Sequence, residues 1–138
     1  MEKLLYNNKL YVCHEYLLEK DFESAVIEQA PHIFGENSIY IDIKKQIGES
    51  IITIPDGYLI DFSLEVEPRL HIIENELSSH DPYKHIGSQL LKFAISYKAS
   101  GRKIKEFLLD ALMKDESMRE RVEAGFLRAG YRLSLIHI

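Results

Sequence analysis

Three carboxylates in the middle of the chain follow apolar runs that are typical of buried strands. Pro55-Asp56 follows the run Ile-Ile-Thr-Ile, and Glu74-Asn75-Glu76 follows Leu-His-Ile-Ile. Burying a carboxylate beside a strand costs free energy unless a cation or hydrogen bonds compensate it. Mg²⁺ would do so, since it prefers carboxylate oxygens and water as ligands. Such an ion activates water and neutralises developing charge in phosphodiester hydrolysis. The sequence therefore predicts a metal site at Asp56 and Glu74.

Each of these residues also has a plainer interpretation. Asp56 precedes Gly57, and Asp-Gly is a common turn pair. Glu76 could form a solvated acidic edge. His80 and His85 suggest zinc, but no further cysteine or histidine stands at ligand spacing, so we expect them at the mouth of the site and the edge of a helix. The spacing of Asp56 and Glu74 favours the metal site over the turn.

A helix is expected before these carboxylates. Asp21 is a good N-cap, and Glu23 falls in the first turn, where the helix dipole favours anions. Pro31 kinks or ends this helix, and Gly35 closes the segment.

Strands are expected to position the carboxylates. Alternation of isoleucine with polar residues over 39–43 predicts a half-buried strand. Two strands over 51–54 and 58–62 should meet at a tight corner, and a third is expected over 70–77. Glu74 and Glu76 are two residues apart, so they should project from the same face.

Helices are expected for the rest of the chain. Asp81 should cap a helix that has Pro82 at its first position and ends at Gly101. Its buried stripe is expected to comprise Tyr83, Ile86, Leu90, Phe93 and Tyr97, with His85, Gln89 and Lys92 on a neighbouring stripe. Residues 102–129 are expected to be helical, either as one helix or as two helices broken near residues 115–117. Their inner face is expected to comprise Ile104, Leu108, Ala111, Met118, Val122 and Gly125.

Residues 20–98 resemble the PD-(D/E)XK nuclease superfamily, the fold of many restriction and repair endonucleases. Pro55-Asp56 looks like its first half-motif, and Glu74-Asn75-Glu76 looks like its second. The stretch from Gln89 to Phe93 is similar to the Gln-x-x-x-(Tyr/Phe) helix signature. Glu76 stands where the superfamily usually has lysine, a Glu-x-Glu form that some active restriction enzymes share.

The resemblance implies an α/β fold with a restriction-endonuclease-like core: a mixed central β-sheet flanked by helices, in the order α-β-β-β-α-β. It implies a Mg²⁺- or Mn²⁺-dependent nuclease acting on nucleic acid, with DNA as the expected substrate. Asp56, Glu74 and Glu23 would be metal ligands. Glu76 would be a base or auxiliary ligand, and Gln89 would contact the backbone or steady the ligands. Lys92 is the first candidate for a relocated lysine, ahead of Lys44 and Lys84.

Composition sets broad limits. The 138 residues suit one domain over 1–138, with 46% hydrophobic and 28% charged residues. A formal charge of −5 does not by itself indicate a nucleic-acid binder. Cys13 is the single cysteine, so a reducing compartment fits. No apolar run suits a signal peptide or membrane span, and we expect a cytoplasmic protein without membrane contact.

Two alternatives and one ambiguity stay open at this point. The chain could be a non-catalytic nuclease-fold domain that binds nucleic acid or a protein partner, or an assembly domain that forms a homodimer through 102–129. The tail over 133–138 could be the last strand of the sheet. It also looks like a translated sequencing adapter, in which case the chain is a truncated domain.

Overall fold

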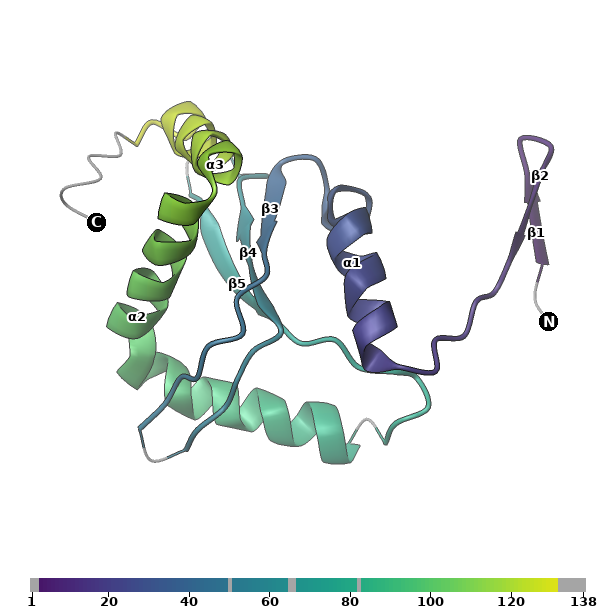
Figure 1. The fold of residues 1–138 in the computed structure, drawn as a ribbon, viewed down its shortest axis with the longest axis horizontal. Coiled ribbons are helices and arrows are strands. Elements are labelled where there is room, and N and C mark those ends of the chain that lie inside the picture. The colour runs from purple at the N-terminus through teal and green to yellow at the C-terminus, as the bar shows by residue number, and fades with distance from the viewer. Residues whose placement is uncertain (1–2, 50, 65–66, 82, 132–138) are drawn as a thin grey trace.

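The computed structural model describes residues 3–49, 51–64, 67–81 and 83–131. In chain order its elements are β1 (Lys3–Tyr6), β2 (Lys9–Val12), α1 (Glu19–Phe34), β3 (Ser38–Ile41), β4 (Gly57–Asp61), β5 (Arg69–Ile73), the π-helical turn η1 (Tyr83–Gly87), α2 (Ser88–Lys114) and α3 (Glu116–Arg128). The β1–β2 hairpin projects away from the body, which is built on the sheet β3-β4-β5 (Figure 1). None of the described helices is long and apolar enough to cross a membrane.

The sheet is an antiparallel meander with β4 in the centre. Ile41 pairs with Tyr58 across β3 and β4, and Tyr58 pairs with Ile72 across β4 and β5. The expected pairing of the strands over 58–62 and 70–77 is therefore confirmed. Helix α1 lies on one side of the sheet, with α3 and the second half of α2 on the other (Figure 1).

The chain is an α/β protein, as expected, and α1, β3, β4, β5 and α2 follow the order α-β-β-β-α. Every strand pair among the described residues is antiparallel. The last strand of the expected order, which the sequence offered over 133–138 as one of two alternatives, lies outside the described residues.

Helix α1 differs from its prediction at the beginning. It starts at Glu19 with Leu18 as N-cap, so Asp21 lies in the first turn and the predicted N-cap is wrong. The amides of Asp21 and Phe22 both donate to the Leu18 carbonyl, which starts the helix without a side-chain cap. Pro31 does not end the helix, because a proline in the last turn removes only one hydrogen bond. Gly35 ends it at a φ of +95°, as predicted.

Two strand predictions are corrected. Residues 51–54 form no strand, and only Thr53 pairs, in an isolated bridge with Ile47. This segment is held by α2 instead, because Ser96 Oγ donates to the Ile51 carbonyl at 2.8 Å and the Gly48 amide donates to Ser100 Oγ at 2.8 Å. Strand β5 ends at Ile73, so the strand argument for placing Glu74 and Glu76 on one face does not apply.

The buried stripe of α2 also differs from its prediction. Phe93 is buried, but Tyr83, Leu90 and Tyr97 are 90%, 61% and 48% exposed. Ser96 and Ser100 are buried on α2 instead, because the loop between β3 and β4 packs over them. Both serines form hydrogen bonds with the backbone of this loop. Pro82 lies outside the described residues.

The ends of the helices agree better with the sequence. Asp81 caps η1, as its Oδ1 accepts from the Tyr83 and Lys84 amides at 3.0 and 3.3 Å. Helix α2 runs through Gly101, which does not adopt positive φ, so the predicted end there is wrong. Of the two alternatives for residues 102–129, the structure has two helices with a break at Asp115, whose Oδ1 accepts from the Met118 amide at 2.9 Å.

The main hydrophobic core packs α2 and α3 against one face of the sheet. Its fully buried side chains include Ile41 and Tyr58 of the sheet, Ile104 of α2 and Val122 of α3. The predicted inner face is confirmed, with Ile104, Val122 and Gly125 buried and Leu108, Ala111 and Met118 half-buried. Gly125 lets α3 approach Phe62, the residue after β4, because a Cβ there would lie 2.6 Å from atoms of the Phe62 ring.

We expect Gly125→Ala to destabilise the protein by about 1–3 kcal/mol, because Phe62 is buried against Phe126 and the ring has little room to move. Gly87→Ala is the matched control, since its Cβ would meet nothing within 4 Å and its backbone is already helical. The control should be neutral or stabilising by up to about 1 kcal/mol. Urea unfolding measures both, and equal stability of the two variants would contradict the close packing of α3 on the sheet.

Candidate active site

The pairing of β4 with β5 brings Asp56 and Glu74 together. Gly57 pairs with Ile73, so the residue before β4 and the residue after β5 meet at the same end of the sheet. The Asp56 amide donates to the Ile73 carbonyl at 3.1 Å, and the Asn75 amide donates to Asp56 Oδ2 at 2.7 Å. Backbone hydrogen bonds thus hold Asp56 against the segment that carries Glu74.

Glu74 is held by the first turn of α2. Its Oε1 accepts from Gln89 Nε2 at 3.1 Å, and Gln89 Oε1 in turn accepts from Thr53 Oγ1 at 3.2 Å. The other carboxylate oxygen, Oε2, is buried and has no hydrogen-bond partner among the described residues. A buried polar atom without a partner is rare in folded proteins, and a bound cation or water commonly accounts for one.

A lysine three residues beyond the end of β3 lies against Asp56. Lys44 Nζ donates to Glu23 Oε2 of α1 and lies 3.7 Å from Asp56 Oδ1. The side chains of Glu23 and Asp56 are each only 17% exposed, whereas Lys44 is 45% exposed. The partly exposed Lys44 therefore contacts both Glu23 and Asp56, and its positive charge offsets part of the repulsion between these two carboxylates.

The surroundings of Asp56 and Glu74 favour the protonated forms of these two carboxyl groups. Burial raises the pKa of Glu74 to about 7, and the charges of Asp56 and Glu76 contribute to the same rise. Burial also raises the pKa of Asp56, against the hydrogen bond from the Asn75 amide. The hydrogen bond to Glu23 raises the pKa of Lys44, so the ammonium form is stabilised. Glu74 can consequently exchange a proton near neutral pH, the range that general acid–base catalysis needs.

The structure thus brings together Glu23, Asp56, Glu74 and Gln89, which were expected from the sequence, with Lys44, one of the two weaker candidates for the relocated lysine. Lys92 makes no hydrogen bond or ion pair with any described residue, so its role as the relocated lysine stays a prediction. Sequence reasoning missed Thr53 and Asn75, because their contacts depend on how the loops fold.

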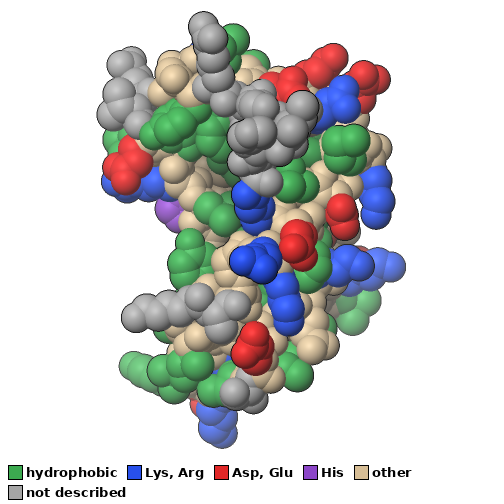
Figure 2. Space-filling view, turned by 90° about the vertical axis from the view of Figure 1, so that its left-hand side faces the viewer, with side chains coloured by type: hydrophobic (Ala, Val, Ile, Leu, Met, Phe, Trp, Pro, Cys, Tyr) green, Lys and Arg blue, Asp and Glu red, His purple; other side chains and the backbone are tan. Residues whose placement is uncertain are grey.

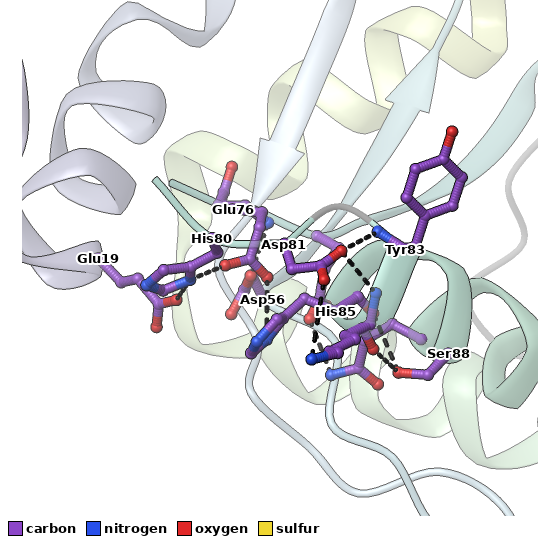
Figure 3. Close-up of polar contacts among 12 residues, drawn as sticks. Glu19, Asp56, Glu76, His80, Asp81, Tyr83, His85 and Ser88 are labelled. Atoms are coloured by element: carbon purple, nitrogen blue, oxygen red, sulfur yellow. Dashed lines mark hydrogen bonds and ion pairs between the residues drawn. The ribbon is translucent and has the colours of Figure 1, made fainter. Parts of the chain in front are cut away.

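Glu76 lies in a different set of contacts. Its carboxylate bonds His80 Nδ1 and lies 3.8 Å from His85 Nδ1, so it faces two imidazoles (Figure 3). The search for a zinc site in the sequence counted only cysteine and histidine, and so overlooked this carboxylate as a third ligand.

The donor set of the acidic cluster fits a hard cation. Carboxylate oxygens of Glu23, Asp56 and Glu74 are the ligand type that Mg²⁺ and Mn²⁺ prefer, and Glu74 Oε2 has no other partner among the described residues. Their oxygens are less closely gathered than the ligand atoms of Glu76, His80 and His85, which all lie within 4.8 Å of one another.

The high pKa of Glu74 predicts how stability depends on pH in metal-free buffer. Below pH 4.5, Glu74 is protonated in both states and contributes nothing. Between pH 4.5 and about 7 the unfolded chain releases this proton while the folded protein keeps it, so stability falls as pH rises. Glu74→Gln removes this loss and should stabilise the protein above pH 7 by on the order of 1 kcal/mol, after a discount for solvent screening.

Thermal melts in EDTA from pH 4 to pH 9 test this prediction. Glu28→Gln, at an exposed position of α1, is the matched control and should follow the wild-type curve. A Glu74→Gln variant whose stability relative to wild type does not change with pH would show that Glu74 is ordinarily solvated.

Comparisons with protein-family models, with curated proteins and with solved structures gave no match to this chain. The likeness to PD-(D/E)XK nucleases consequently rests on the motifs and stays a prediction.

Proposed function

We propose that this protein is a metal-dependent nuclease that hydrolyses phosphodiester bonds of nucleic acid, with DNA as the expected substrate. The observation that carries the proposal is Glu74, a half-buried carboxylate with one unpartnered oxygen among the described residues, opposite Asp56 at the end of two paired strands. A charge in this position costs free energy in the free protein, and catalytic sites commonly contain such costly groups.

Glu23, Asp56 and Glu74 would hold Mg²⁺ or Mn²⁺, which would supply an activated water and neutralise the charge of the leaving oxygen. Gln89 fixes the orientation of Glu74, because it is itself held by Thr53. Binding of a cation favours the ionised form of Glu74, so its high pKa in the free protein would fall.

Lys44 is the residue best placed to supply the positive charge that Glu76 cannot. Its ammonium group already lies beside Asp56, and it reaches the cluster from the segment after β3 rather than from the second half-motif. In the proposed reaction it would leave its ion pair with Glu23 and face the phosphate. Lys92 remains the second candidate for this role.

A non-catalytic binding domain is the second candidate function. The ion pairs of Lys44 offset the charges of Glu23 and Asp56 without any metal, so these two acids do not require one. Arg102, Lys103 and Lys105 are exposed on α2, and Lys and Arg side chains gather in the middle of the face shown in Figure 2. Such a face could contact phosphates without reading sequence.

A homodimer through 102–129 also remains a proposal. It would use the apolar groove of about 280 Å³ that Leu70, Leu108 and Phe126 line between β5, α2 and α3.

A cleavage assay on linear, nicked and single-stranded DNA with Mg²⁺ or Mn²⁺ tests the nuclease proposal. Asp56→Asn and Glu74→Gln should each lose more than about 100-fold in rate, because the bound ion contributes several kcal/mol to the transition state. Lys44→Met should lose roughly 10-fold or more, if its charge meets the phosphate. Lys45→Met is the matched control and should keep full activity, since Lys45 is exposed and forms no ion pair with the described residues.

Thermal melts with and without each metal accompany the assay. Loss of cleavage in Asp56→Asn with an intact fold supports the nuclease. If the wild-type protein cleaves no substrate, and neither metal changes its melting temperature, the binding domain should replace the nuclease as the proposed function.

A further inference from the structure

The connection between β5 and α2 places two imidazoles around one carboxylate. Glu76 Oε1 is hydrogen-bonded to His80 Nδ1, and Glu76 Oε2 lies 3.8 Å from His85 Nδ1. One ligand atom from each of the three residues lies within 4.8 Å of the other two. Figure 3 shows the three side chains converging from this connection and from the start of the following helix.

The backbone that carries these residues has its own hydrogen bonds. The His80 amide donates to the Leu77 carbonyl at 3.0 Å, which closes a turn, and the His85 amide donates to the Asp81 carbonyl at 3.0 Å. His85 lies in η1, and π-helical turns are rare and occur frequently at functional sites. The backbone at His80 and at His85 is thus held by hydrogen bonds of its own.

Two imidazole nitrogens and one carboxylate oxygen form a ligand set typical of transition metals. Zn²⁺ is often bound by three such ligands with a fourth position left for water, whereas Mg²⁺ prefers oxygen ligands only. Ligand atoms around a tetrahedral ion stand roughly 3.3–3.5 Å apart, given metal–ligand distances of about 2.0–2.1 Å. Small rotations of His80 and Glu76 would therefore bring the three ligand atoms to that spacing.

We propose that Glu76, His80 and His85 bind a divalent transition metal, with Zn²⁺ as the expected ion, at a site separate from the Asp56–Glu74 cluster. This inference does not depend on the proposed nuclease activity, because it uses none of the residues assigned to Mg²⁺ there.

The surroundings allow an ion to enter and leave a coordination position open. The His80 and His85 side chains are 34% and 54% exposed, whereas Glu76 is 12% exposed. Glu76 also borders a hollow of about 560 Å³ that Tyr16 and Phe22 help to line. Glu19 Oε1 of α1 lies 3.2 Å from His80 Nδ1, so either this carboxylate or water would be the fourth ligand.

Titration calorimetry of the full chain, freed of metal by EDTA and carrying no histidine tag, tests the proposal with ZnCl₂ alone. Wild-type protein should bind one Zn²⁺ with a dissociation constant in the micromolar range or below. Glu76→Gln, His80→Asn and His85→Asn should each weaken binding by more than about 100-fold, beyond the 10–100-fold loss expected for a residue that only supports a ligand. Bound Co²⁺ should show the visible spectrum of a four- or five-coordinate ion, which the same variants lose.

Three control variants distinguish this site from adventitious Zn²⁺ binding elsewhere on the chain. His32→Asn removes an exposed histidine of α1 that has no partner among the described residues, and it should bind Zn²⁺ as wild type does. Asp56→Asn and Glu74→Gln should also keep Zn²⁺ binding, whatever they do to cleavage. Zn²⁺ affinity weaker than millimolar, or affinity that all three ligand variants retain, would overturn the proposal. Circular dichroism of each variant shows that its fold is intact.

Discussion

The candidate site depends on one constraint, the register of β4 against β5. Because Gly57 pairs with Ile73, the backbone must place Asp56 and Glu74 at the same end of the sheet. Two carboxylates brought together and half-buried repel each other, and burial adds the larger cost, as the raised pKa of Glu74 indicates. Core packing must supply this free energy, and Tyr58 at the centre of β4 is fully buried.

The loop between β3 and β4 links this acidic end of the sheet to the first half of α2. It bonds the helix through Gly48 and Ile51, and Thr53 holds Gln89 in the orientation that meets Glu74. The serines of α2 are thus buried because a loop covers the helix there, and the backbone of that loop needs hydrogen-bond partners. The same arrangement leaves Leu90 and Tyr97 on the surface, where they are free to contact other molecules.

Two polar systems adjoin across the short segment 74–76. Glu74 belongs to the cluster with Asp56 and Gln89, while Glu76 faces His80 and His85. Their charges still interact, since Glu76 contributes to the raised pKa of Glu74. A cation bound at either system would lower the cost of ionising Glu74.

Local patterns in the sequence were enough to predict the α/β class, a strand that begins near Ile39 and the pairing of the strands over 58–62 and 70–77, and they offered the break at Asp115 as one of two alternatives. Alternation, caps and short connections depend on neighbouring residues only, and the motif spacing likewise singled out Asp56, Glu74 and Gln89. Tertiary structure decided the rest. Lys44 reaches Asp56 because β3 lies beside β4 and the chain continues past its paired residues, and α2 buries serines because a loop packs on it. Glu76 joins two histidines because β5 ends at Ile73 and releases the chain from the strand periodicity that the sequence suggested.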